Sequence, residues 1–86
     1  MADNSVVAMQ IPPSERALRE TILDHLKECE TKKYRRLKKN KELEEYIALI
    51  VSMTTRYANN LMESGVFSST AWFTAIRETI LGAEPD

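Results

Sequence analysis

The chain contains few of the residues on which small secreted folds and most active sites depend. Its 86 residues include one cysteine, one histidine, two glycines and three prolines. A single cysteine excludes an internal disulfide framework, and with no secretory signal pattern at the start we expect a reducing, cytoplasmic location. The scarcity of glycine and proline argues against a turn-rich β fold. Abundant Leu, Glu, Lys, Arg, Ala and Met favour helix.

Long apolar runs and catalytic motifs are also missing. No apolar run approaches the roughly 18 residues that a membrane span needs, so we expect no membrane partner. His25 and Cys29 share a helical face, but a closed zinc site needs about four such ligands, and we expect Cys29 to fill an apolar seam instead. With no nucleophile–base pair and no glycine-rich loop, we expect a non-enzymatic protein without cofactor, metal or small-molecule substrate.

The strongest positive pattern is an apolar strip between Leu43 and Leu61. Residues at alternating spacings of four and three share one face of a helix, and five of these six are apolar: Leu43, Ile47, Ile50, Thr54, Tyr57 and Leu61. Further apolar residues widen the strip on both sides, namely Tyr46, Leu49, Val51, Met53, Ala58 and Met62. A strip this wide must be covered, and we predict that the chain alone cannot cover it.

Boundary residues predict where the helices begin and end. Ser14 is a suitable N-cap for a first helix whose narrower stripe is Leu18, Ile22, Leu26 and Cys29. Gly65 is expected at the C′ position of the central helix, with Val66 folding back on its last turn. Ser68 or Ser69 is expected to cap a third helix that Gly82 ends, and its apolar residues are Trp72, Phe73, Ile76, Ile80 and Leu81.

A dense basic run joins the first two stripes. Seven of the twelve basic residues lie between Lys32 and Lys41, with no acidic residue among them, and Glu42, Glu44 and Glu45 follow directly. Two architectures fit: one helix continuing from about Ser14 to Ser64, or a turn near Asn40, which then caps the next helix. We favour the turn, because it places cations at the end of one helix and carboxylates at the start of the next, as helix dipoles favour.

The resulting fold prediction is all-α. Two helices, about 14–39 and 41–64, are expected to form an antiparallel hairpin, and a short third helix, about 69–81, is expected to fold back against the second. The whole of 14–82 is expected to be a single helical domain, with a flexible arm at 1–13 and a frayed tail at 83–86. Pairing of two copies is expected to complete the bundle.

These features predict a protein-interaction module that acts as a homodimer or as a small subunit or adaptor of a complex. The expected interface residues are Leu43, Tyr46, Ile47, Ile50, Met53, Tyr57, Leu61, Trp72, Phe73 and Ile76, from types common in interface cores. The alternative is a small nucleic-acid-binding regulator whose polyanion-binding residues are Lys32, Lys33, Tyr34, Arg35, Arg36, Lys38, Lys39 and Lys41. Two other interpretations of this segment are a solvated charge cluster and pairing with Glu42, Glu44 and Glu45 or with acidic residues of a second copy. A helix-turn-helix around Gly65 is disfavoured, since Arg77 is the one cation of its third helix.

Overall fold

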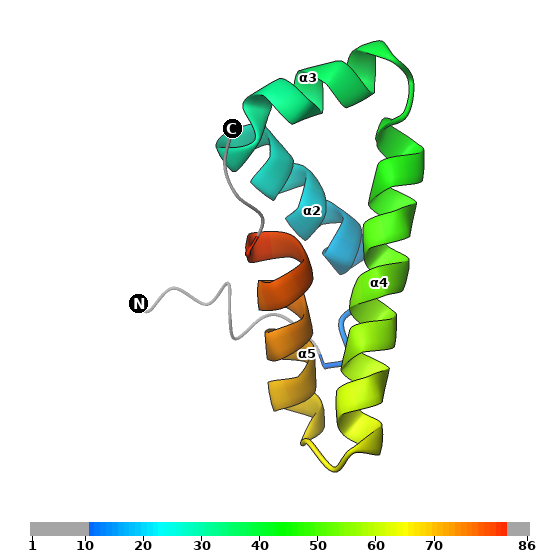
Figure 1. Ribbon diagram of the computed structural model, residues 1–86, viewed down its shortest axis with the longest axis vertical. Helices are drawn as coiled ribbons and strands as arrows, with labels where there is room; N and C mark the ends of the chain where they lie inside the picture. Colours follow the sequence, from blue (N-terminus) through cyan, green and yellow to red (C-terminus); the bar gives the residue numbers. More distant parts are fainter. Residues whose placement is uncertain (1–10, 83–86) are drawn as a thin grey trace.

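The computed structural model of the chain describes residues 11–82, and within this range it consists of helices and their connections (Figure 1). Four α-helices follow one another, α2 (Glu15–Cys29), α3 (Thr31–Lys39), α4 (Leu43–Glu63) and α5 (Ser68–Ile76), and a short π-helix η1 (Arg77–Leu81) continues α5. The predicted all-α fold is confirmed. The predicted tail and residues 1–10 of the predicted arm lie outside the described range.

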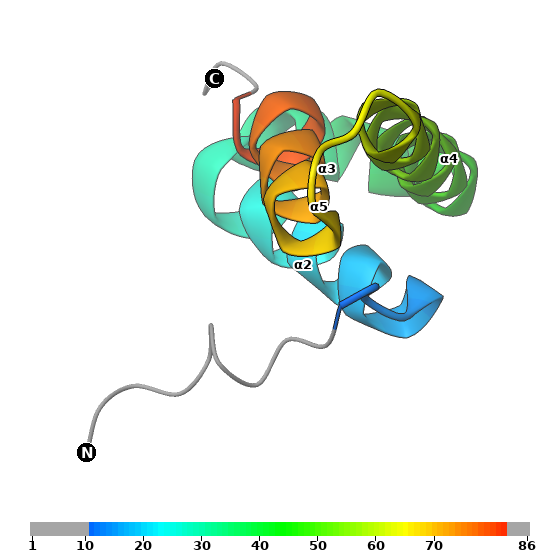
Figure 2. The ribbon, with the colours of Figure 1, turned by 90° about the horizontal axis from the view of Figure 1, so that it is seen from below.

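Three helices pack around a common centre, and the fourth lies across one end. Helix α4 runs the length of the molecule, α5 runs antiparallel beside it, and α2 packs against α4 and against η1, while α3 connects α2 to the start of α4 (Figure 1). In the view along α4 and α5, α2 lies below this pair of helices (Figure 2). The predicted return of the third helix against the second is confirmed.

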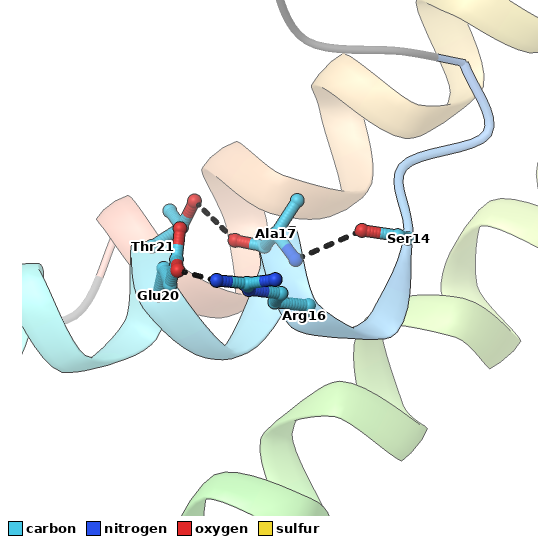
Figure 3. A network of polar contacts seen from close by, with 5 residues as sticks. All are labelled: Ser14, Arg16, Ala17, Glu20 and Thr21. Atoms are coloured by element: carbon cyan, nitrogen blue, oxygen red, sulfur yellow. Dashed lines mark hydrogen bonds and ion pairs between the residues drawn. The ribbon is translucent and has the colours of Figure 1, made fainter.

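The first turn of α2 forms as the sequence predicts. Ser14 has extended backbone angles, and its Oγ accepts a hydrogen bond from the backbone N–H of Ala17 at 3.0 Å (Figure 3). On the same turn Thr21 donates its hydroxyl hydrogen to the carbonyl oxygen of Ala17, and Arg16 lies 3.5 Å from Glu20. The cap satisfies one of the N–H groups that a helix start leaves without a partner, and so it fixes where α2 begins.

The predicted first helix, 14–39, is wrong in one respect: it is two helices with a bend at Glu30. The backbone of Glu30 leaves the helical region, with φ −129° and ψ 55°. The hydrogen bonds continue across the bend, because Glu30 N–H donates to Leu26 and Tyr34 N–H donates to Glu30. Neither Gly nor Pro marks the bend. It lets α3 turn back over the core, where Leu37 is 7% exposed.

The predicted turn near Asn40 is confirmed, but Asn40 does not cap α4. Asn40 ends α3, and Glu42 occupies the N-cap position of α4 without a side-chain cap bond. Lys41 adopts a left-handed φ of 60°, and the N–H of Glu42 donates to the carbonyl of Leu37 at 2.8 Å. This is the hydrogen bonding of a Schellman turn, with a lysine where glycine is usual. The turn completes the end of α3, and α4 therefore begins at Leu43 rather than at residue 41.

A second turn of this type ends α4 at Gly65, as predicted. Gly65 has φ 100°, its N–H donates to Met62, and the N–H of Val66 donates to Leu61. The predicted serine cap of the third helix is not found. Helix α5 starts at Ser68, and Phe67 occupies its N-cap position without a side-chain hydrogen bond.

The core is built from one face of each helix. Its buried apolar residues are Leu18, Ile22, Leu26, Leu37, Ile47, Ile50, Ala58, Ala71, Trp72, Ala75, Ile76 and Ile80. The expected burial of Cys29 is wrong, since Cys29 is exposed. Helix α2 ends at Cys29, and the next residue, Glu30, continues the four-residue spacing of Leu18, Ile22 and Leu26 into the interior. Of the five apolar residues of the predicted third helix, Trp72, Ile76 and Ile80 are buried, whereas Phe73 and Leu81 are exposed.

Candidate functional site

Helix α4 has two apolar sides with different environments. The inward side is covered by the chain's own helices: Ile47, Ile50, Thr54 and Ala58 are each less than 9% exposed. The ten predicted interface residues therefore separate. Ile47, Ile50, Trp72 and Ile76 lie in the core, Leu43, Tyr46 and Leu61 are half-buried, and Met53, Tyr57 and Phe73 are exposed. The structure does not bring the ten residues together on one exposed surface.

The outward apolar side of α4 is the open stripe, defined as Leu49, Met53 and Tyr57. These side chains are 56%, 45% and 38% exposed, and they follow one another at a spacing of four along the helix. Two exposed charges of opposite sign, Glu45 and Arg56, border the stripe. At its C-terminal end a shallow hollow of about 310 Å³ is lined by Tyr57, Asn60, Leu61 and Ser64. The open stripe is thus an exposed apolar strip on the longest helix.

The basic segment, Lys32 to Lys41, covers α3 and the turn after it. Its cations Arg35, Arg36, Lys38, Lys39 and Lys41 are exposed, and no acidic side chain in the described part of the chain pairs with them. Glu44, which follows the segment, pairs instead with Arg19 of α2. Lys33 points inward, to Glu30 and Tyr46. Tyr34 is half-buried, and its ring lies under the ammonium groups of Lys27 and Lys38.

A buried polar cluster at the α2–α3 bend was not predicted. Glu30 is 1% exposed, its Oε1 lies 3.2 Å from Nζ of Lys33, and its Oε2 lies 3.6 Å from Nε2 of His25. The second contact is an ion pair only when His25 is protonated. Lys33 also reaches Tyr46 of α4, at 3.5 Å from the hydroxyl oxygen and 5.2 Å from the ring centre. The four-residue spacing from Leu18 to Leu26 extends to Glu30, which is the signal that could have located this cluster.

The cluster changes the protonation of Lys33. Partial burial acts to lower its pKa, but the hydrogen bond to Glu30 and the contacts with Tyr46 act in the other direction and prevail, so the pKa of Lys33 is raised above 10.5. Lys33 therefore stays charged at neutral pH, and it offsets part of the cost of burying the Glu30 carboxylate. The arrangement ties the bend to α4.

Two threonines join the inward side of α4 to η1. The hydroxyl groups of Thr54 and Thr79 contact each other, and each also lies within hydrogen-bond distance of the carbonyl oxygen four residues earlier in its own helix. Thr54 was the one polar residue in the predicted apolar strip. Its complete burial is tolerated because its hydroxyl group has partners in the interior.

A larger hollow of about 470 Å³ lies between the N-terminal parts of α2 and α4. Glu15, Arg16, Arg19, Glu20 and Glu44 supply its charged side chains, and Leu23, Leu43 and Ile47 form its apolar base. The charges are neutralised locally, since Arg16 pairs with Glu20 and Arg19 with Glu44.

Residues 11–82 contain neither a cluster of metal ligands nor a membrane-spanning helix. No three His, Cys, Asp or Glu side chains in this range are grouped as metal ligands. No helix there has both the length and the apolar character to cross a bilayer. Comparison of the chain with protein-family models, with curated proteins and with solved structures finds no significant match.

Proposed function

We propose that the protein is a non-enzymatic helical interaction module that pairs with a second copy of itself through the open stripe of α4. The observation that carries the proposal is the exposure of Leu49, Met53 and Tyr57 at successive turns of the longest helix. Large apolar side chains aligned on one exposed helix face are typical of a helix–helix contact. In this proposal the core of each copy is already covered, and pairing covers the second apolar side of α4.

The charges beside the stripe favour a second copy as the partner. Glu45 and Arg56 are eleven residues apart, about three helical turns, so both lie on the same side of α4. In an antiparallel pair related by a two-fold axis near residue 51, Leu49 of one copy faces Met53 of the other. Glu45 of one copy then lies opposite Tyr57 of the other, within one residue of Arg56, and this contact occurs twice per dimer. The surface is therefore self-complementary in charge and in apolar character, as an isologous interface requires.

The size of the stripe limits the expected affinity. Leu49 and Tyr57 are separated by eight residues, which is about 12 Å along a helix. An interface of this length is at the small end of specific interfaces, so we expect a dissociation constant of roughly 1–100 µM. The protein is expected to be monomeric at nanomolar concentration and dimeric at high micromolar concentration.

The test is the mass in solution as a function of concentration, measured by sedimentation equilibrium from about 1 to 300 µM. Met53→Glu places a carboxylate in the centre of the stripe and is expected to keep the protein monomeric throughout. Ala48→Glu is the matched control: Ala48 is exposed on α4 but lies about 140° around the helix from Met53, so pairing should persist. A wild-type chain that stays monomeric at 300 µM contradicts the proposal, as does equal loss of pairing in both variants.

The charge pair gives a second test that separates a symmetric dimer from other contacts. Glu45→Arg sets arginine against arginine across the axis, and Arg56→Glu sets carboxylate against carboxylate, so each single variant should dimerise more weakly. The double variant restores opposite charges and should recover most of the lost affinity. If the double variant is as weak as the sum of the two single variants, the antiparallel arrangement is wrong.

A further inference from the structure

The basic segment is a second surface, separate from the open stripe. It carries a charge of +7 within ten residues of a chain whose net charge is −1, so the rest of the chain carries −8. The helix it occupies lies across one end of the molecule, where α3 connects α2 to α4 (Figure 1). One face of α3 is used for packing, through Leu37, which is 7% exposed. The remaining faces present the cations.

The five exposed cations of the segment have no acidic partner within residues 11–82. Lys33 is held by Glu30 and Tyr46, and Lys38 lies 5.8 Å from the ring centre of Tyr34. Arg35 and Lys39 are exposed four residues apart on one face of α3, where like charges repel and weaken the helix by a few tenths of a kcal/mol per pair. A bound polyanion would remove this repulsion. The net charge of the segment thus favours an anionic partner with several phosphate groups.

Two features of α3 decide between classes of polyanion. An anionic membrane surface is normally bound by a helix that also inserts an apolar face, but the apolar residue of α3, Leu37, is buried in the core. Single-stranded nucleic acid is normally bound by stacking bases on aromatic rings, but Tyr34 is half-buried and already contacts Lys27 and Lys38. A double helix, recognised through its phosphates alone, requires neither feature.

We infer that the exposed cations of α3 and its following turn form a sequence-independent binding surface for the phosphate backbone of double-stranded nucleic acid. The residues are Arg35, Arg36, Lys38, Lys39 and Lys41. Helix α3 has nine residues, or about 14 Å, which matches about four base pairs along the duplex axis. The inference does not depend on pairing through the open stripe, because the two surfaces share no residue.

The test measures binding of the full chain to a labelled 20-base-pair DNA duplex of mixed sequence by fluorescence anisotropy, from 50 to 200 mM salt. Five phosphate contacts predict a slope of log K against log salt of about −4.5. Arg35→Gln/Lys39→Gln removes two of them, so affinity at 100 mM salt should fall about 10- to 100-fold and the slope should approach about −2.7. Both residues are exposed, and circular dichroism checks that the helices are retained.

The matched control is Arg16→Gln/Arg77→Gln, which changes the net charge equally at two exposed arginines outside the segment. It should bind within about twofold of the wild type, and the charge-conserving Arg35→Lys/Lys39→Arg should also bind. No binding at 50 mM salt, or equal loss in the control, overturns the inference. Tighter binding to single-stranded oligothymidine, or to vesicles containing 30% phosphatidylserine, than to the duplex also overturns it.

Discussion

The two apolar sides of α4 have similar composition but different environments. Ile47 and Ile50 are buried, whereas Leu49 and Met53 on the same helix are 56% and 45% exposed. Periodicity alone placed all of them in one wide strip. The difference shows that the helices within residues 11–82 cover one side of α4 and leave the other side exposed.

The largest expected effect contrasts one residue from each side. Ile47→Ala should lower the free energy of unfolding by about 2–5 kcal/mol, because it leaves a cavity among packed side chains. Leu49→Ala should change it by less than about 0.5 kcal/mol in the monomer. Urea unfolding at 1 µM, followed by the fluorescence of the single, buried Trp72, measures both. Equal losses would mean that the two sides do not differ in packing.

The dependence of the unfolding midpoint on protein concentration also distinguishes the two sides of α4. If the open stripe pairs two copies, the unfolding midpoint of the wild type should rise with protein concentration, since association stabilises the folded chain. The midpoint of Leu49→Ala should rise less. The loss caused by Ile47→Ala should persist at every concentration, because the contacts of Ile47 are internal.

The polar cluster at the end of the covered side should give the next largest effect. Lys33→Met removes the cation nearest to the buried carboxylate of Glu30, and the free energy of unfolding should fall by about 2 kcal/mol at pH 7. Lys39→Met is the comparison on the exposed side of α3, and it should cost less. If the two variants lose equal stability, the Glu30–Lys33 contact contributes nothing specific.

The raised pKa of Lys33 makes a prediction about alkaline pH. A lysine whose pKa is higher in the folded than in the unfolded chain holds its proton more tightly when folded. Its contribution to stability is complete below pH 10.5, the unfolded value, and is lost as the pH rises through the folded pKa. The difference in unfolding free energy between the wild type and Lys33→Met should therefore shrink above pH 10.5. A constant difference from pH 9 to 11.5 would contradict this.

The turns before and after α4 have equivalent backbone hydrogen bonds, but the left-handed position is Lys41 in the first and Gly65 in the second. Gly65→Ala forces a side chain into a left-handed conformation, with open space around it, and should cost about 1 kcal/mol. Lys41→Gly removes the same strain and should stabilise by about 0.5–1 kcal/mol, despite the added freedom of the unfolded chain. Thermal unfolding measures both. Destabilisation by Lys41→Gly would show that the lysine side chain stabilises its turn.

The smallest expected effect concerns the polar residue within the covered side. Thr54→Val keeps the shape of the side chain and removes a hydroxyl group that contacts Ile50 and Thr79. Thr79 keeps a partner in the carbonyl oxygen of Ala75, so the cost should be about 1 kcal/mol or less. Urea unfolding measures it, and a loss above about 2 kcal/mol would mean that the threonine pair is essential to the contact between α4 and η1.

Local chemistry predicted two of the helix boundaries that depend on a single residue, whereas the caps predicted at Asn40 and at Ser68 or Ser69 are not found. The Ser14 cap and the Gly65 turn are as predicted, because each needs only its own side chain and the neighbouring backbone. The bend at Glu30 was not predictable in this way. It leaves most backbone hydrogen bonds in place, carries no Gly or Pro, and depends on Leu37 reaching the core and on Lys33 lying beside a buried carboxylate.

The two candidate surfaces also differ in whether the sequence alone could locate them. The basic segment could be read directly, because cations tend to stay at the surface wherever their helix packs. The expected interface could not, since apolar periodicity identifies residues that avoid water without saying what covers them. Ile50 and Met53 belong to the same pattern, yet one is buried in the core and the other is exposed.

The sequence by itself determined that this chain is helical, where most of its helices start and stop, and which residues prefer to leave water. The tertiary structure alone decided which of those residues the chain buries for itself. The reason is geometric: a helix presents apolar groups around a wide arc, and only the placement of α2, α3 and α5 selects the part of that arc that is covered.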